Sequence, residues 1–357
     1  MTAEDKKNDN ETSLSVALTE TGVEAKAKSR FIAAIDRLFG SVADWARSHI
    51  DARTEVRNAK TRGEVQLIET VTQYGVEKLG ADPDRAERAF DRHFRKVLSE
   101  QENLDAVVRE AADNLKISPP TETQSNDERT LSQEFLDRFE TYAATASTDE
   151  LRQRWGRVLA SEVKTPGTFS PKVLRVVDEL DSKAALLFEN VSRNSIDGVI
   201  PICLSGELPY SSTRSLVNAG LIEDPGFEGQ IRMFRQLSAN DGELHFVLPF
   251  SKGAVVIPVT EIKIRKGFAL PSKAAAVVVN GDKGIAVPAY LMTDVGRDIV
   301  SILPDLGEGV LRRLFDAIAG EITDVLDASW MRLYFGDDLS SLRFDTEITL
   351  PLKRDDE

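Results

Sequence analysis

Hydrophobic positions in the first third of the chain recur with helical spacing. Between about residues 29 and 50, large apolar side chains return every three or four positions, which is typical of one buried helix face. The members of this stripe that matter below are Phe31, Ile35, Leu38, Phe39 and Trp45. Pro83, after a break in the pattern, predicts the start of another helix that runs to about residue 98. We therefore predict a helical arm over residues 22–115, preceded by a disordered polar segment at 1–21.

A polar run separates this arm from a second helical region. Residues 116–130, KISPPTETQSNDERT, contain two prolines and no periodicity, so we predict a linker that makes few contacts. A fragment from about residue 127 onward is then expected to fold without the arm. Within the helical segment predicted at 131–195, the helix-start signals are the capping pattern Ser147-x-x-Glu150, Ser170 before Pro171, and Asp181.

From residue 196 the period of the pattern changes from helical to two. Short β-branched runs such as VIPICL, HFVLPF, AVVIPVT and IAVPAYL alternate with turn signals, of which NGDKG is a good hairpin turn. Helices are predicted at about 211–219, 294–302 and 307–319, and the strand-like runs SWMRLYFG and LRFDTEITL follow. The fold class is thus predicted to be α+β, with the helical arm and helical segment followed by an α+β domain over 196–357 that carries a strand-rich insertion.

Two segments of this last domain have the pattern of a degenerate winged helix. SLVNAGLIED has Gly220 at the end of a helix, and YLMTDVGRDIV has Thr293 at the start of the next, as in winged-helix domains of bacterial regulators. Two features weaken a role in DNA binding. The sequence between Leu204 and Gly220 predicts one helix instead of two, and residues 205–225 carry one arginine, Arg214, against three carboxylates.

The composition excludes several kinds of site. One cysteine, Cys203, and three histidines cannot form an intramolecular disulfide, a thiolate zinc cage or an iron–sulfur site, so no metal and no cofactor is expected. The sequence has no phosphate loop, nucleophile elbow or HExxH motif, and we assign no catalytic residue. It also has no secretory signal and no membrane-spanning run, which predicts a cytoplasmic protein. Attachment of the basic helix at 29–50 to a membrane surface stays open.

Charge bears on the choice of partner. The chain has 45 Lys and Arg against 59 Asp and Glu, and the net charge of −14 disfavours nucleic acid as the main partner. The strand-rich insertion at 226–290 is an exception, with eight basic residues against five acidic. Lys263, Arg265 and Lys266 lie close together in it and are the candidate nucleic-acid contacts, although an ordinary solvated sheet face explains them as well.

The most distinctive local sequence is WGRVLASEVKTPGTFSPKVLRVVDELDSKAALLF, residues 155–188. We interpret it as a tryptophan-anchored helix pair with a tight proline–glycine corner, in which an arginine or lysine compensates Glu162 near the helix end. The segment resembles the bacterial family called domain of unknown function 2806, whose motif positions are occupied here by Trp155, Leu159, Glu162, Pro166, Gly167, Phe169, Ser170 and Phe188. This resemblance implies no activity, cofactor or catalytic residue. A looser similarity to abortive-infection proteins implies a role in phage defence.

Three hypotheses for the function follow. The first is a cytoplasmic interaction or regulatory protein, related to stress or phage defence, that binds another protein or forms a homo-oligomer through Ile35, Leu38, Phe39 and Trp45. The second is a nucleic-acid-binding regulator that uses the winged-helix-like domain with its basic insertion. The third is an enzyme of a class that the sequence does not reveal.

Overall fold

The computed structural model describes residues 25–39, 83–121, 124–125, 127–239, 242–260, 262, 274–280, 284–303, 306–336 and 341–350. The chain divides into two compact units, Met1–Asp178 (unit 1) and Glu179–Glu357 (unit 2), and each is described by itself. The boundary falls inside 131–195, which the sequence predicted as one helical segment. The segment 1–21, Trp45 and the basic residues Lys263, Arg265 and Lys266 lie outside the described residues.

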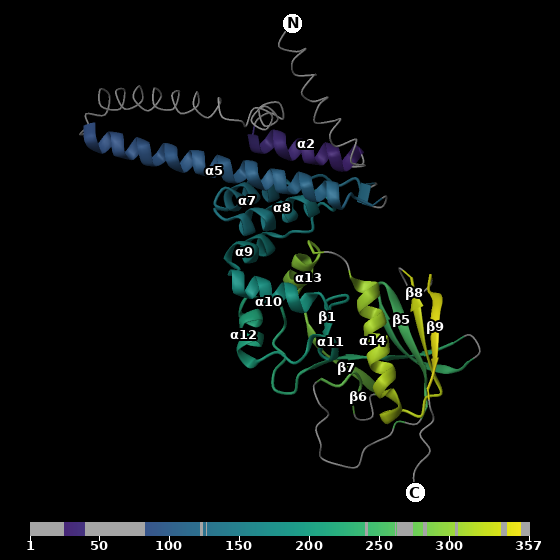
Figure 1. The fold of residues 1–357 in the computed structure, drawn as a ribbon. Helices are drawn as coiled ribbons and strands as arrows, with labels where there is room; N and C mark the ends of the chain where they lie inside the picture. Colours follow the sequence, from purple (N-terminus) through teal and green to yellow (C-terminus); the bar gives the residue numbers. More distant parts are fainter. Residues whose placement is uncertain are drawn as a thin grey trace. The chain divides into compact units, whose positions relative to one another are not determined.

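Unit 1 is helical. Its named helices are α2 (Ala25–Phe39), α5 (Pro83–Ile117), α7 (Gln133–Ala143), α8 (Asp149–Lys164) and α9 (Pro171–Glu179), the last of which ends one residue beyond the unit (Figure 1). Helix α5 begins at Pro83 as predicted but extends well past residue 98, because apolar side chains continue at helical spacing from Leu104 to Leu115.

The helix starts follow the local signals closely. Pro171 opens α9, and the hydroxyl of Ser170 accepts a hydrogen bond from the backbone N–H of Val173 at 3.4 Å. At α8 the cap lies one residue later than predicted, since Thr148 rather than Ser147 accepts the backbone N–H of Leu151.

The arm helices share one core with the helices that follow them in unit 1. Phe31, Ile35 and Leu38 of α2 are buried, and the Trp155 ring of α8 is fully buried against Tyr142 at 5.6 Å between ring centroids. Helices α5 and α8 approach closely at Gly156, where a Cβ atom would lie only 2.4 Å from the Cβ of Glu110. The lack of a side chain at this position is therefore what permits the contact.

The stretch 116–130 differs from the contact-poor linker that the sequence predicts. Lys164 Nζ donates to the Ser118 hydroxyl at 3.2 Å, and Gln124 Nε2 donates to the Thr165 hydroxyl at 3.3 Å. A fragment from residue 127 would lose α5, which covers one face of α8. Removing α5 would expose that apolar face of α8 to water. A fragment that is to fold alone should therefore begin near the unit boundary at residue 179.

Unit 2 combines helices with antiparallel strands. In chain order its elements are α10 (Ser182–Ser192), β1 (Val199–Pro201), α11 (Ile202–Ser205), α12 (Tyr210–Asn218), β2 (Gln230–Met233), β3 (Arg235–Ser238), β4 (Leu244–Phe250), β5 (Gly253–Pro258), β6 (Val278–Val279), β7 (Ile285–Leu291), α13 (Asp294–Val300), α14 (Gly307–Glu321), a 3₁₀ turn at Ile322–Asp324, β8 (Trp330–Phe335) and β9 (Arg343–Thr349). Together with unit 1 this confirms the α+β class and the helical N-terminal part.

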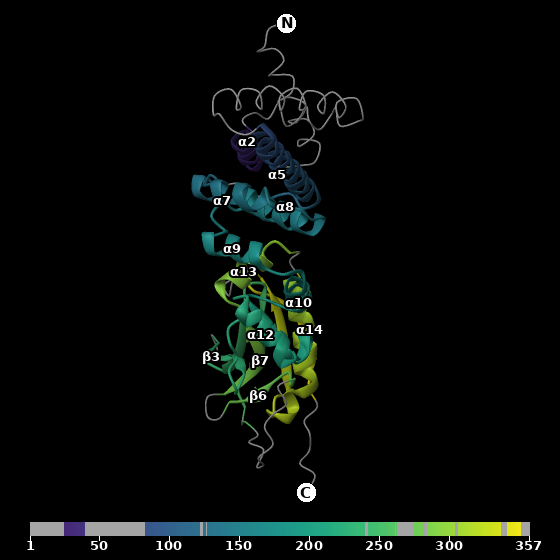
Figure 2. The ribbon, with the colours of Figure 1, turned by 90° about the vertical axis from the view of Figure 1, so that its left-hand side faces the viewer.

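The strands form two sheets around one core. The first has the order β1-β7-β2, with β6 also paired to β7, and the second has the order β3-β4-β5-β8-β9. Helix α14 runs along the second sheet (Figure 1 and Figure 2), and its Leu311 and Phe315 belong to the same buried cluster as Phe246, Val255 and Leu333 of the strands. In β8 buried positions alternate with partly exposed ones, and Met331 and Leu333 pack on the core, whereas residues on both faces of the central strand β4 are buried.

The two segments with a winged-helix pattern lie side by side. Gly220 follows α12 with a φ of 72°, and Thr293 caps α13 by accepting the N–H of Gly296 at 3.0 Å. The N–H of Thr293 donates to the carbonyl of Leu221 at 3.1 Å, which links the segments directly. Between Leu204 and Gly220 the one predicted helix is found as α12, whereas the end of the run VIPICL, predicted as a strand, forms the short helix α11.

Candidate functional site

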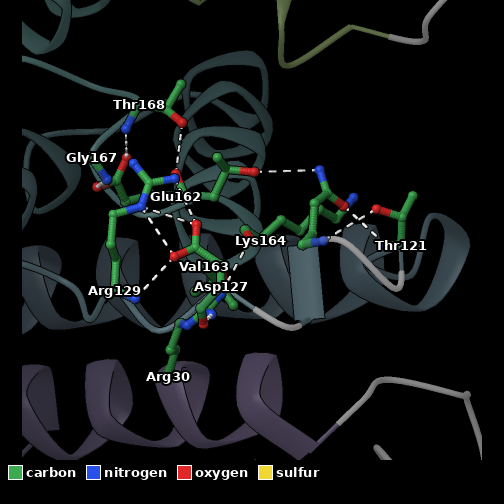
Figure 3. Close-up of polar contacts among 11 residues, drawn as sticks. Arg30, Thr121, Asp127, Arg129, Glu162, Val163, Lys164, Gly167 and Thr168 are labelled. Atoms are coloured by element: carbon green, nitrogen blue, oxygen red, sulfur yellow. Dashed lines mark hydrogen bonds and ion pairs between the residues drawn. The ribbon is translucent and has the colours of Figure 1, made fainter. Parts of the chain in front are cut away.

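The distinctive motif of unit 1 is organised around a buried carboxylate (Figure 3). The C-terminal turn of α8 carries Glu162, which is 1 % exposed. Its oxygens accept the backbone N–H groups of Gly167 at 2.6 Å, Thr168 at 3.1 Å and Phe169 at 3.1 Å. Gly167 has a φ of 86°, a left-handed conformation that glycine adopts without strain, and this turns the chain back so that the three amides point at one side chain. The carboxylate therefore holds the proline–glycine corner closed.

Arginines supply positive charge beside this carboxylate. Burial raises the pKa of the Glu162 carboxyl, and the three amides and the charge of Arg129 oppose that rise in part. Arg129 is itself bonded to Asp127, whose pKa the guanidinium lowers to about 2. Arg30 of α2 donates to the carbonyl oxygens of Val163 at 2.8 Å and of Asp127. The predicted compensating arginine is thus present, while the three amide donors were not foreseen.

The other motif residues have structural roles in the fold. Trp155, Leu159, Pro166 and Phe169 are buried in unit 1, and Ser170 caps α9. Phe188 lies in α10 and is buried in unit 2. Both oxygens of Glu162 are already occupied by backbone amides. This arrangement of a carboxylate that is 1 % exposed stabilises a loop.

The remaining candidates of the sequence analysis are separated in the fold. Ile35 and Leu38 are buried within unit 1, and Phe39 is half-buried, so most of the predicted self-association stripe is used inside the chain's own core. Among the residues that the structure describes, no three His, Cys, Asp or Glu side chains group as metal ligands. Burial raises the pKa of the Cys203 thiol to about 11, which keeps it protonated and weakly nucleophilic at neutral pH. In the same described part, no helix has the length and apolarity that crossing a bilayer requires.

Unit 2 contains a cavity of about 570 Å³, which we call the unit 2 pocket. Four chain segments line it: the turn after α10, the β4–β5 hairpin turn, the region of α13, and the start of α14. The lining residues are Ser192, Ser195, Ile196, Asp197, Gly198, Ser251, Lys252, Met292, Arg297, Val300, Ser301, Leu303, Leu306 and Gly307. Its volume lies within the range of small-molecule sites, about 300 to 1,000 Å³.

One wall of the unit 2 pocket has an unusual backbone. Asp197 has a φ of 53° and Gly198 a φ of 74°, the pair of positive angles that a type I′ turn requires. The Asp197 carboxylate accepts the backbone N–H of Ser251 at 2.5 Å and also the Ser251 hydroxyl. This contact ties the turn after α10 to the β4–β5 hairpin, and so fixes two of the four lining segments relative to each other.

The guanidinium of Arg297 is held against the same turn. A Cβ atom at Gly198 would lie 2.7 Å from Arg297 Cδ, so the glycine makes room for the arginine. Arg297 Nη1 donates to the carbonyl of Met292 at 2.9 Å, and Nη2 donates to the Asp294 carboxylate. These contacts use two of the five N–H groups that an arginine carries. A fixed cationic group therefore lies beside the apolar side chains of the pocket.

The sequence did not predict this pocket, because its lining comes from separate segments between residues 192 and 307. The sequence Ile196-Asp197-Gly198-Val199 does carry a turn signal, since Asp-Gly pairs favour type I′ turns. That signal predicts the turn but does not predict that the turn lines a pocket.

Comparison with known proteins yields one match. No curated protein and no solved structure matches the chain. Residues 87–198, which include the whole motif around Glu162 and the first turn of the pocket, match the model of a family described as a protein of unknown function (DUF2806).

Proposed function

We propose that the chain is a regulatory binding protein whose C-terminal unit takes a small-molecule ligand in the unit 2 pocket. The observation that supports this proposal most strongly is the cavity itself, about 570 Å³ with fixed charged groups beside an apolar wall. Such a combination is typical of sites that recognise one end of a ligand by charge and the rest by apolar contact.

The pocket lies between two parts of unit 2, which is why we assign it a regulatory role. One part has the element order α10-β1-α11-α12-β2-β7 and the sheet order β1-β7-β2, and this supports a winged-helix-like fold. The second part is the five-stranded sheet with α14. Lining residues come from both, so a ligand there stabilises the arrangement of the two parts that forms the pocket.

In a winged-helix domain, α12 would be the helix that contacts DNA. Its charges favour binding of a protein or a small ligand over binding of DNA. Arg214 of α12 forms an ion pair with Asp224 at 3.1 Å, and Glu223 lies next to that carboxylate in the sequence. These charges oppose approach to phosphates. Because Ile35 and Leu38 are buried in unit 1, we assign the binding function to unit 2 rather than to self-association of α2.

The lining chemistry favours an anionic ligand with an apolar body. Among the lining residues, Arg297 and Lys252 carry positive charge against the one carboxylate of Asp197. The oxygens of that carboxylate accept from Ser251, and Arg297 also pairs with Asp294 outside the lining. Met292, Val300 and Leu303 supply apolar surface. A carboxylate or phosphate monoester on a short hydrocarbon could contact the cationic side chains with its anionic group and the apolar side chains with its hydrocarbon.

Ligand-observed NMR with the full chain tests the proposal. Phenyl phosphate and hexanoate are the anionic probes, and hexylamine is the cationic control of similar apolar size. We expect the anions to bind and the amine not to bind. The variant Ser301→Phe, which fills the pocket from its rim, should abolish binding, and the matched variant Ser211→Phe on α12 should not. Equal binding of amine and anions, or binding unaffected by Ser301→Phe, contradicts the proposal.

A further inference from the structure

One face of the five-stranded sheet in unit 2 carries a row of aromatic and basic side chains. Arg332 of β8 pairs with Val256 of β5, Val256 pairs with Val247 of β4, and Val247 pairs with Arg235 of β3. Directly paired residues project to the same side of a sheet. Arg332 and Arg235 therefore lie on one face, and Trp330 and Tyr334, two positions from Arg332 along β8, lie on it too.

This face is opposite the one that α14 covers. The alternate residues Met331 and Leu333 of β8 are fully buried in the core with the helix. On the other side Phe344 is 59 % exposed, Arg235 is exposed, and Trp330 is partly exposed. We call the set Arg235, His245, Trp330, Arg332, Tyr334 and Phe344 the aromatic face.

The rings on the aromatic face form two neighbouring pairs with an arginine between them. Tyr334 and Phe344 are 5.9 Å apart between ring centroids, and His245 and Trp330 are 5.6 Å apart. The guanidinium of Arg332 lies 4.1 Å above the Trp330 ring and is held there by Glu347. Flat rings with an arginine stacked among them are the chemistry on which unpaired bases stack.

Local charge is compatible with a phosphate backbone at this surface. The part of the sequence from 226 to 290, which supplies β2 to β6 and most of β7, has eight lysines and arginines against five carboxylates, although the whole chain has a net charge of −14. Among the described residues of that part, Arg235 is the exposed cation on the aromatic face, and its charge can attract a phosphate group. Arg235 is exposed on the edge strand β3, diagonally opposite His245 of the aromatic face in the sheet register.

We propose that the aromatic face binds single-stranded nucleic acid, with bases stacked on Phe344, Tyr334 and Trp330 and with the backbone near Arg235. A single strand fits better than a duplex, because duplex bases are already stacked and their faces are unavailable. This surface is distinct from the unit 2 pocket. Failure of the small-molecule proposal would therefore not contradict nucleic-acid binding, and the reverse also holds.

Fluorescence anisotropy of the full chain with labelled oligo(dT) and oligo(rU) of about twelve nucleotides tests it. At low salt we expect binding that weakens steeply as salt is added. Phe344→Ser should weaken it at least about fivefold through lost stacking, and Arg235→Glu should weaken it and reduce the salt dependence. Phe227→Ser, at a ring that is 96 % exposed elsewhere on unit 2, and Arg193→Glu on α10 are the matched controls and should bind as the wild type does.

Several results would overturn the proposal. These are no binding at low salt, equal losses in the control variants, and duplex binding as tight as single-strand binding. Light scattering could give one more contradicting result. If the wild-type chain is an oligomer that does not bind the oligonucleotides, and Phe344→Ser makes it a monomer, the aromatic face is a contact between copies of the chain. Circular dichroism confirms in each case that the variant is folded.

Discussion

Replacing Glu162 by glutamine tests the role of the family motif. The carboxylate accepts the N–H of Gly167 through one oxygen and the N–H groups of Thr168 and Phe169 through the other. Glutamine keeps one oxygen, so its NH₂ group must face at least one of these donors. The change removes one charge-assisted hydrogen bond and leaves a donor opposite a donor, for which we expect a loss of about 2 to 4 kcal/mol in the free energy of unfolding.

Urea unfolding followed by the fluorescence of Trp155 measures this loss. The chain has three tryptophans, and replacing Trp45 and Trp330 by phenylalanine leaves the fully buried Trp155 as the only emitter, which reports on unit 1 alone. With a slope of about 2 kcal/mol per molar urea, the midpoint should fall by about 1 to 2 M.

The control is Glu128→Gln, the same chemical change at an exposed residue near the motif. It should move the midpoint by less than about 0.25 M, the equivalent of about 0.5 kcal/mol. If Glu162→Gln behaves like Glu128→Gln, Glu162 does not anchor the loop, and a functional role for its carboxylate has to be considered again.

Three further predictions follow from single contacts. Gly156→Ala should destabilise unit 1 by about 1 to 2 kcal/mol in urea because the new Cβ overlaps Glu110, whereas Gly320→Ala in α14, with nothing within 4 Å, should stabilise by up to about 1 kcal/mol. Cys203 should react with a disulfide reagent at pH 8 far more slowly in the native protein than in urea, because its pKa is about 11. The lowered pKa of Asp127 stabilises the fold above its ordinary pKa of 3.8, and this contribution should vanish as pH falls from about 4 to about 2, a change that Asp127→Asn should lack.

Local chemistry made much of the fold predictable. The Asp181 cap, the start of α9 at Pro171 and the antiparallel pairing of β6 with β7 on either side of NGDKG depend on neighbouring residues, and all three are found where the sequence indicated them. The helix end at Gly220 and the helix cap at Thr293 were also predictable, because each depends on the backbone or side-chain preference of its own residue. Their direct contact, however, needed the three-dimensional structure.

Two larger misses concern tertiary packing. Residues 116–130 are polar and lack periodicity, yet their side chains and backbone bond to α2 and α8. Polarity alone does not distinguish a linker from a segment held by hydrogen bonds. The aromatic face was missed for a similar reason, since Trp330 and His245 are far apart in sequence and only the register of the strands brings their rings together.

Hydrogen exchange of the full chain, with and without phenyl phosphate, tests the central claim most directly. If the ligand lies in the unit 2 pocket and contacts both of its walls, exchange should slow in peptides covering residues 192–198 and in those covering 296–307, and these effects should disappear in Ser301→Phe. Slower exchange confined to one of the two regions, to another part of the chain, or equally present in Ser301→Phe would contradict the assignment of this pocket as a ligand site.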